Sequence, residues 1–82
     1  MHVNVKLYAT LRQFAPPGTA IGESFEVELQ HGRISDIIAR LRFPPDQARI
    51  IFVNGVRTFD LNQKLSDDDL VVFFPPVGGG SS

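Results

Sequence analysis

A change in the spacing of apolar residues limits the possible folds of this chain most strongly. Residues 2–8 and 24–30 each carry an apolar side chain at every second position, which is typical of strands with one buried face. Residues 34–41 then switch to the spacing i, i+3, i+4, i+7, which predicts one amphipathic helix. The apolar residues that set these patterns are Val3, Val5, Leu7, Phe25, Val27, Leu29, Ile34, Ile37, Ile38 and Leu41, and Tyr8 falls among the polar positions of the first segment.

The second half of the chain adds short strands and strong turn signals. The run 50–53 predicts a third strand, and the Asn54-Gly55 turn leads to a possible short strand at 56–59. Residues 61–69 are polar and turn-like, and 70–74 form the last predicted strand, which Pro75-Pro76 stops. Pro16-Pro17-Gly18 joins the first two strands as a hairpin. The order of elements is then hairpin, helix, two short strands and a final strand, which predicts an α+β fold of the β-grasp type. In it, one main helix covers one face of a mixed sheet of four to five strands.

Size and composition exclude several classes of function. A chain of 82 residues forms one domain and is too small to enclose a substrate cleft of its own, so we expect it to act with partners. The net charge of −1, with scattered arginines, gives no footprint for nucleic acid or an anionic membrane. The chain has no cysteine, so it forms no disulfide and any sulfur that it handles comes from another molecule. No signal peptide or membrane-spanning run is apparent, and we expect a cytoplasmic location.

The C-terminal third resembles one family in the order and spacing of three motifs. A strand ends in Asn-Gly at 53–55, an acidic turn at 65–71 leads into the last strand, and the chain closes with Phe-Phe-Pro-Pro-Val-Gly-Gly-Gly at 73–80. These motifs are similar to those of the molybdopterin synthase small subunit and the related thiamin-type sulfur carriers. The resemblance implies a ubiquitin-like β-grasp domain over residues 1–77 and a flexible Gly-rich tail over 78–82. Gly78 takes the variable place before the diglycine, Gly79 and Gly80.

The resemblance also implies a reaction and a set of partners. In this family an ATP-dependent adenylating (E1-like) enzyme activates the terminal glycine carboxylate, and a sulfur donor protein converts the acyl adenylate to a thiocarboxylate. The sulfur is then used by the large catalytic subunit of the synthase. By position, Gly80 would carry the adenylate and the thiocarboxylate. The chain itself would be a non-catalytic carrier, with no cofactor and no metal of its own.

Two features depart from the family pattern. Asp68 stands where the acidic turn usually carries glycine, and Asp also tolerates left-handed turn conformations. Ser81 and Ser82 follow Gly80, so the reactive carboxylate is not terminal until they are removed. Three interpretations of these serines stay open: they are native, a protease removes them, or they are a remnant of the expression vector.

The strand pattern also predicts a surface for partners. If Val71 and Phe73 point into the core, alternation turns Leu70, Val72 and Phe74 outward. In a β-grasp the strands at 50–53 and 70–74 are neighbours, so Ile50 and Phe52 would join them in one exposed apolar patch. The predicted partner-binding residues are Phe52, Leu70, Val72 and Phe74, with Pro75 and Pro76 at the root of the tail. Burial on both faces of the sheet, or a homodimer contact, is the alternative.

Other functions are compatible with the same residues. A ubiquitin-like modifier would use the same tail to form isopeptide bonds with lysines. A non-covalent β-grasp binding or regulatory domain would have an inert tail. The pathway is also open, because molybdenum or tungsten cofactor synthesis, thiamin synthesis, tRNA thiolation and amino-acid sulfur transfer all use similar carriers; Phe-Phe-Pro-Pro-Val favours the pterin branch. The three consecutive acids at 67–69 indicate a solvated turn rather than a metal site.

Overall fold

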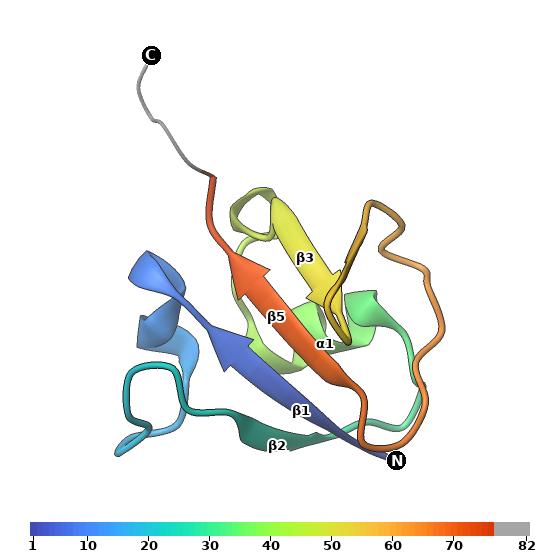
Figure 1. Ribbon diagram of the computed structural model, residues 1–82, viewed down its shortest axis with the longest axis horizontal. Coiled ribbons are helices and arrows are strands. Elements are labelled where there is room, and N and C mark those ends of the chain that lie inside the picture. Colours follow the sequence, from blue (N-terminus) through green and yellow to red (C-terminus); the bar gives the residue numbers. More distant parts are fainter. Residues whose placement is uncertain (77–82) are drawn as a thin grey trace.

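Five strands form one mixed sheet in the order β2-β1-β5-β3-β4 in the computed structural model, which describes residues 1–76. The central strands β1 and β5 run parallel, and the other neighbours run antiparallel (Figure 1). The strands are β1 (His2–Leu7), β2 (Phe25–Glu28), β3 (Ile50–Val53), β4 (Val56–Thr58) and β5 (Leu70–Phe74). The predicted α+β layout is therefore confirmed, including the pairing of β3 with β5.

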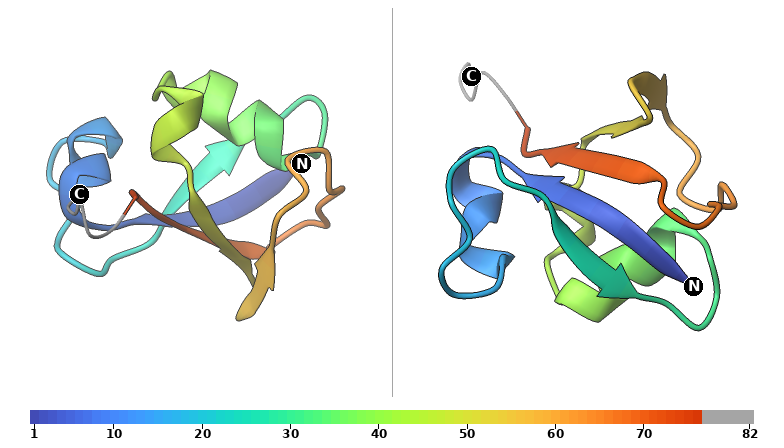
Figure 2. Two further views of the ribbon diagram at one scale, coloured as in Figure 1. Left: turned by 90° about the horizontal axis from the view of Figure 1, so that it is seen from above. Right: turned by 60° about the horizontal axis from the view of Figure 1, so that its bottom comes forward.

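One α-helix and two 3-10 helices complete the fold. The helix α1 (Ile34–Leu41) lies on one side of the sheet and leaves the other face uncovered (Figure 2). The 3-10 helices are η1 (Ala9–Phe14), which follows β1, and η2 (Pro45–Gln47), which was not predicted. None of the helices in the described part of the chain is long and apolar enough to cross a membrane.

The core lies between α1 and the sheet. Alternation along β5 buries Val71 and Phe73 completely, as predicted, and the same parity buries Ile51 and Val53 on β3. At the centre, the ring of Phe73 meets the ring of Phe43 edge to face, with 5.2 Å between centroids. Each fully buried side chain of this kind contributes about 1.5–3 kcal/mol through removal of apolar surface from water. The hydrophobic effect thus fixes which face of each strand points inward.

Local interactions define both ends of α1. No Ser or Thr caps its start, and instead the Asp36 carboxylate accepts a hydrogen bond from the Arg33 N–H at 2.9 Å. The helix ends at Leu41, and the next residue, Arg42, has a left-handed φ of 64° and donates its N–H to the Ile38 carbonyl. Such an end is common, but glycine normally occupies it because a Cβ is strained there. Pro44 then follows and prevents continuation.

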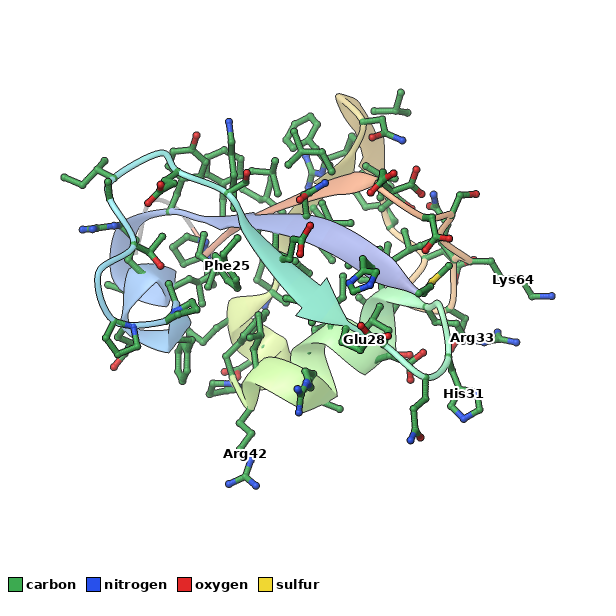
Figure 3. All side chains as sticks on the ribbon, turned by 90° about the horizontal axis from the view of Figure 1, so that it is seen from below. Phe25, Glu28, His31, Arg33, Arg42 and Lys64 are labelled. Atoms are coloured by element: carbon green, nitrogen blue, oxygen red, sulfur yellow. The ribbon has the colours of Figure 1, made fainter. Side chains whose placement is uncertain are left out.

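Replacing Arg42 by glycine should therefore stabilise the protein. The Arg42 side chain extends away from the body (Figure 3), so its removal sacrifices little packing. We expect the Arg42→Gly variant to gain about 0.5–1 kcal/mol in the free energy of unfolding, measured by urea denaturation. Arg40→Gly is the matched control, because Arg40 is also exposed but lies inside the helix. There glycine should cost about 1 kcal/mol, and equal effects at both positions would contradict the left-handed assignment.

Candidate docking face and root of the tail

The face of the sheet away from α1 carries the residues that were predicted to bind a partner. Phe52 on β3 pairs directly with Val72 on β5, and Ile50 pairs with Phe74, so their side chains share one face. Each of these residues is half-buried. We call this surface the docking face, and it consists of Tyr8, Ile50, Phe52, Leu70, Val72 and Phe74.

Contacts between aromatic rings explain why the docking face is only partly exposed. The ring of Tyr8 stacks on that of Phe74 with 4.8 Å between centroids and an interplanar angle of 9°. Phe52 meets the other side of this group edge to face, 6.1 Å from Phe74. Pairs of this kind contribute about 0.5–1.5 kcal/mol beyond the area that they bury. The three rings therefore form a pre-arranged apolar surface rather than independent side chains.

Strand β5 leads from the docking face directly into the predicted tail. Near the end of β5, the Tyr8 N–H donates to the Phe73 carbonyl at 3.2 Å. This hydrogen bond joins the residue that follows β1 to the last residues of β5 before the prolines. Pro75 is buried and Pro76 is exposed, so Pro76 alone of the two offers surface to a partner. Both rings restrict φ to about −65°, which limits the directions in which the chain can leave. Gly78, Gly79 and Gly80 lie outside the described residues.

The acidic turn before β5 holds the strand in place. The Asp67 carboxylate accepts from the His2 N–H at 3.0 Å, and the Asp69 carboxylate accepts from the Ser66 N–H at 2.8 Å. Asp68 has a φ of 69°, a left-handed conformation that accounts for a preference for glycine at this position. Among residues 1–76 there is no group of three or more His, Asp or Glu side chains that could hold a metal ion. These carboxylates act as hydrogen-bond acceptors for the backbone.

Asn54 links the β3–β4 turn to the beginning of β5. Its Oδ1 accepts from the Leu70 N–H at 2.9 Å, and its Nδ2 donates to the Asp69 carboxylate at 2.9 Å. Its backbone also has a left-handed φ of 50° and is followed by Gly55 at 84°, the pattern of a tight hairpin turn. One side chain therefore sets both the turn and the register of two strands of the docking face.

Replacing Asn54 by alanine should remove both contributions. The variant loses two side-chain hydrogen bonds, and it places an alanine Cβ in a strained left-handed conformation. Together these two effects should lower the free energy of unfolding by about 2–3 kcal/mol. Asn54→Gly keeps the backbone conformation accessible and loses only the side-chain bonds, so we expect about half that loss. Urea denaturation of both variants measures the difference. Equal losses would show that the left-handed turn contributes nothing.

Three residues of the uncovered face were missed by sequence reasoning. Arg57 on β4 pairs directly with Phe52, and its guanidinium carbon lies 4.6 Å from the centre of the Phe59 ring. Phe59 is 82% exposed, the highest value among the large hydrophobic residues of the described chain. Tyr8 was likewise grouped with the polar positions of its strand. Strand parity places all three on the docking side, so the signal was present in the pattern.

These features define a ubiquitin-like β-grasp domain: a mixed five-stranded sheet, one helix across one face, and a central last strand that delivers the C-terminal segment. The model of the ThiS family matches residues 5–80, and the chain belongs to this family. This is a family of small sulfur carriers with a ubiquitin-like fold.

Solved structures share this fold. The putative molybdopterin converting factor subunit 1 from Pyrococcus furiosus is 29% identical, with a TM-score of 0.67 over 94% of this chain and 99% of that one. Small archaeal modifier protein 1 of Haloferax volcanii has a TM-score of 0.68 at 22% identity, over 93% of this chain and 98% of its own. One chain in the complex of subunits 1 and 2 of the Helicobacter pylori molybdopterin-converting factor has a TM-score of 0.61 at 22% identity, over 98% of this chain and 100% of its own. No curated protein sequence matches the chain.

Proposed function

We propose that this chain carries sulfur for molybdopterin synthesis and that its reactive group is the carboxylate of Gly80. The observation that carries the proposal is the extent of the family match, which runs to residue 80 and so includes Gly78, Gly79 and Gly80. The similarity to a putative molybdopterin converting factor subunit 1 supports the pterin branch. The chain contributes a docking face and a reactive end, and its partners supply the catalytic groups.

The reaction needs two steps, because a carboxylate is a poor electrophile at neutral pH. The Gly80 carboxylate first attacks the α-phosphate of ATP on an adenylating enzyme, which forms an acyl adenylate and releases pyrophosphate. Hydrosulfide, supplied by a sulfur donor protein, then attacks the acyl carbon and displaces AMP, which leaves a thiocarboxylate. Glycines suit this position because a chain without side chains can enter a narrow channel.

The geometry at the end of β5 supports delivery of this group into another protein. The docking face lies beside Pro75 and Pro76, so a partner that grips the face also receives the chain that leaves it. Six residues from Pro75 to Gly80 span at most about 20 Å when extended. In Helicobacter pylori, subunits 1 and 2 of the molybdopterin-converting factor form a complex, and we propose that a comparable large subunit binds here.

Intact mass spectrometry tests the proposal directly. The chain ending at Gly80 is incubated with the adenylating enzyme of the same organism, ATP and sulfide. We expect a product whose mass exceeds the starting chain by the difference between sulfur and oxygen. Adducts to lysine side chains without this product would instead indicate a modifier. If a chain that ends at Val77 kept its partner and its cellular function, the tail would be inert and the proposal wrong.

A further inference from the structure

The hairpin β3–β4 extends the docking face toward the edge of the sheet. Phe52 pairs with Arg57, and a directly paired residue points to the same side of a sheet as its partner. The ladder runs Val53 to Val56, Phe52 to Arg57 and Ile51 to Thr58. One further step in the same register would place Phe59 opposite Ile50, again on the docking side.

Arg57 and Phe59 restrain each other at this edge. The guanidinium lies over the aromatic ring at 4.6 Å from its centre, within the range of a cation–π interaction. This contact holds the exposed Arg57 side chain in place before a partner arrives, so the side chain loses less conformational entropy when it binds. Phe59 nevertheless remains 82% exposed, so a large apolar surface stays open beside the charge.

Charge on the docking side is arranged around the apolar centre. Lys6 on β1 pairs with Val72 and lies on one side of the apolar residues of β3 and β5, and Arg57 on β4 lies on the other side. Within residues 1–76, neither cation has a carboxylate within salt-bridge distance. By contrast, Glu28 on β2 lies 3.4 Å from the N-terminal ammonium of Met1 and 3.1 Å from the His2 ring. Lys6 and Arg57, on the two strands that flank β5 and β3, are therefore positive, and the carboxylates of Glu26 and Glu28 on this face lie one strand further out, on β2.

We propose that Arg57 is a specificity-determining residue that binds a carboxylate of the adenylating enzyme when this enzyme covers the docking face, while Phe59 packs against an adjoining apolar side chain of the same enzyme. This inference rests on the proposed carrier function, which requires that enzyme as a partner at the face. The partner surface has an apolar centre and acidic residues at the margin over β4. Arginine suits this role because its planar fork can hold a carboxylate through two hydrogen bonds, and arginine and aromatic residues are enriched at interfaces.

Steady-state adenylation of the chain ending at Gly80, by the adenylating enzyme of the same organism, tests the inference. We expect Arg57→Glu to raise the KM for the carrier at least about tenfold while kcat changes less than about twofold, since the charge acts on binding and not on the reacting group. Arg40→Glu is the control: it makes the same charge change at an exposed position on α1, and its KM should stay within about twofold of the wild type. Raising the salt concentration should raise the KM of the wild type by a larger factor than the KM of Arg57→Glu.

The outcomes separate this inference from the proposed function. No adenylation of the wild type would overturn the carrier function itself. Normal adenylation of the wild type with equal KM values for Arg57→Glu and Arg40→Glu would overturn only the role of Arg57, as would a loss confined to kcat. A dimer of the wild type in sedimentation that Arg57→Glu dissociates would assign the face to a second copy of the chain and contradict a partner with an acidic margin. Phe59→Ala should raise KM by about threefold or more if the ring packs against the partner.

Discussion

Replacing Phe73 by alanine is expected to lower the free energy of unfolding by about 3–5 kcal/mol, the largest effect on stability of any variant considered. The side chain is fully buried on the central strand β5 and meets the ring of Phe43 edge to face. Its removal leaves a cavity between the sheet and α1 that the surrounding side chains fill only in part. Urea denaturation followed by circular dichroism measures the loss. Should this variant not fold, Phe73→Leu, with an expected loss of about 1–2 kcal/mol, gives the same test.

The neighbouring residue provides a matched control for this prediction. Phe74 has the same side chain but points to the opposite face, where it is half-buried between Tyr8 and Phe52. We expect Phe74→Ala to cost about 1–2 kcal/mol, because less surface returns to water and no closed cavity forms. Equal losses for the two variants would show that both faces of β5 are buried, which was the alternative interpretation of the strand pattern.

The fold could be predicted because local patterns and long-range pairing agree along most of the chain. The strand over 70–74 was predicted with the bounds that the structure has, since its alternation is strict and Pro75 ends it. The helix over 34–41 was also predicted correctly, although the Asp36 carboxylate and not a serine or threonine satisfies its first amide. The strand at β4 is one residue shorter than the segment 56–59 that was predicted. Edge strands fray because one side lacks a partner.

The details of the candidate site were harder to predict, because they depend on contacts between distant segments. The stack of Tyr8 on Phe74 requires the parallel pairing of the first and last strands, which no local pattern encodes. The burial of Pro75, next to the exposed Pro76, likewise depends on what surrounds the end of β5. The positions of Arg57 and Phe59 follow from the register of a two-residue turn, so they could have been derived from Asn54-Gly55 with strand parity alone.

Extending the reactive end is expected to separate binding from chemistry. We expect the chain that ends at Ser82 to be adenylated at least about a hundredfold more slowly than the chain that ends at Gly80, because misplacement of a reacting group by even 1 Å can cost about that factor. Two further residues displace the carboxylate by up to about 7 Å and place two hydroxymethyl side chains in the channel. ATP–pyrophosphate exchange with the adenylating enzyme measures the rate.

The docking face should be unaffected by this extension, and that provides the internal control. Tyr8, Phe52 and Phe74 are the same in both chains. The chain ending at Ser82 should therefore compete with the chain ending at Gly80 and inhibit its adenylation. We expect the inhibition constant of the longer chain to be close to the KM of the shorter one. A third chain that ends at Gly80 and carries Phe74→Ala should show the reverse behaviour, with a raised KM and an unchanged kcat. If the chain ending at Ser82 instead reacts as fast as the shorter one and keeps its full mass, the reactive carboxylate is not that of Gly80. Failure of the longer chain to compete would show that the docking face contributes little affinity and that the partner recognises the tail alone.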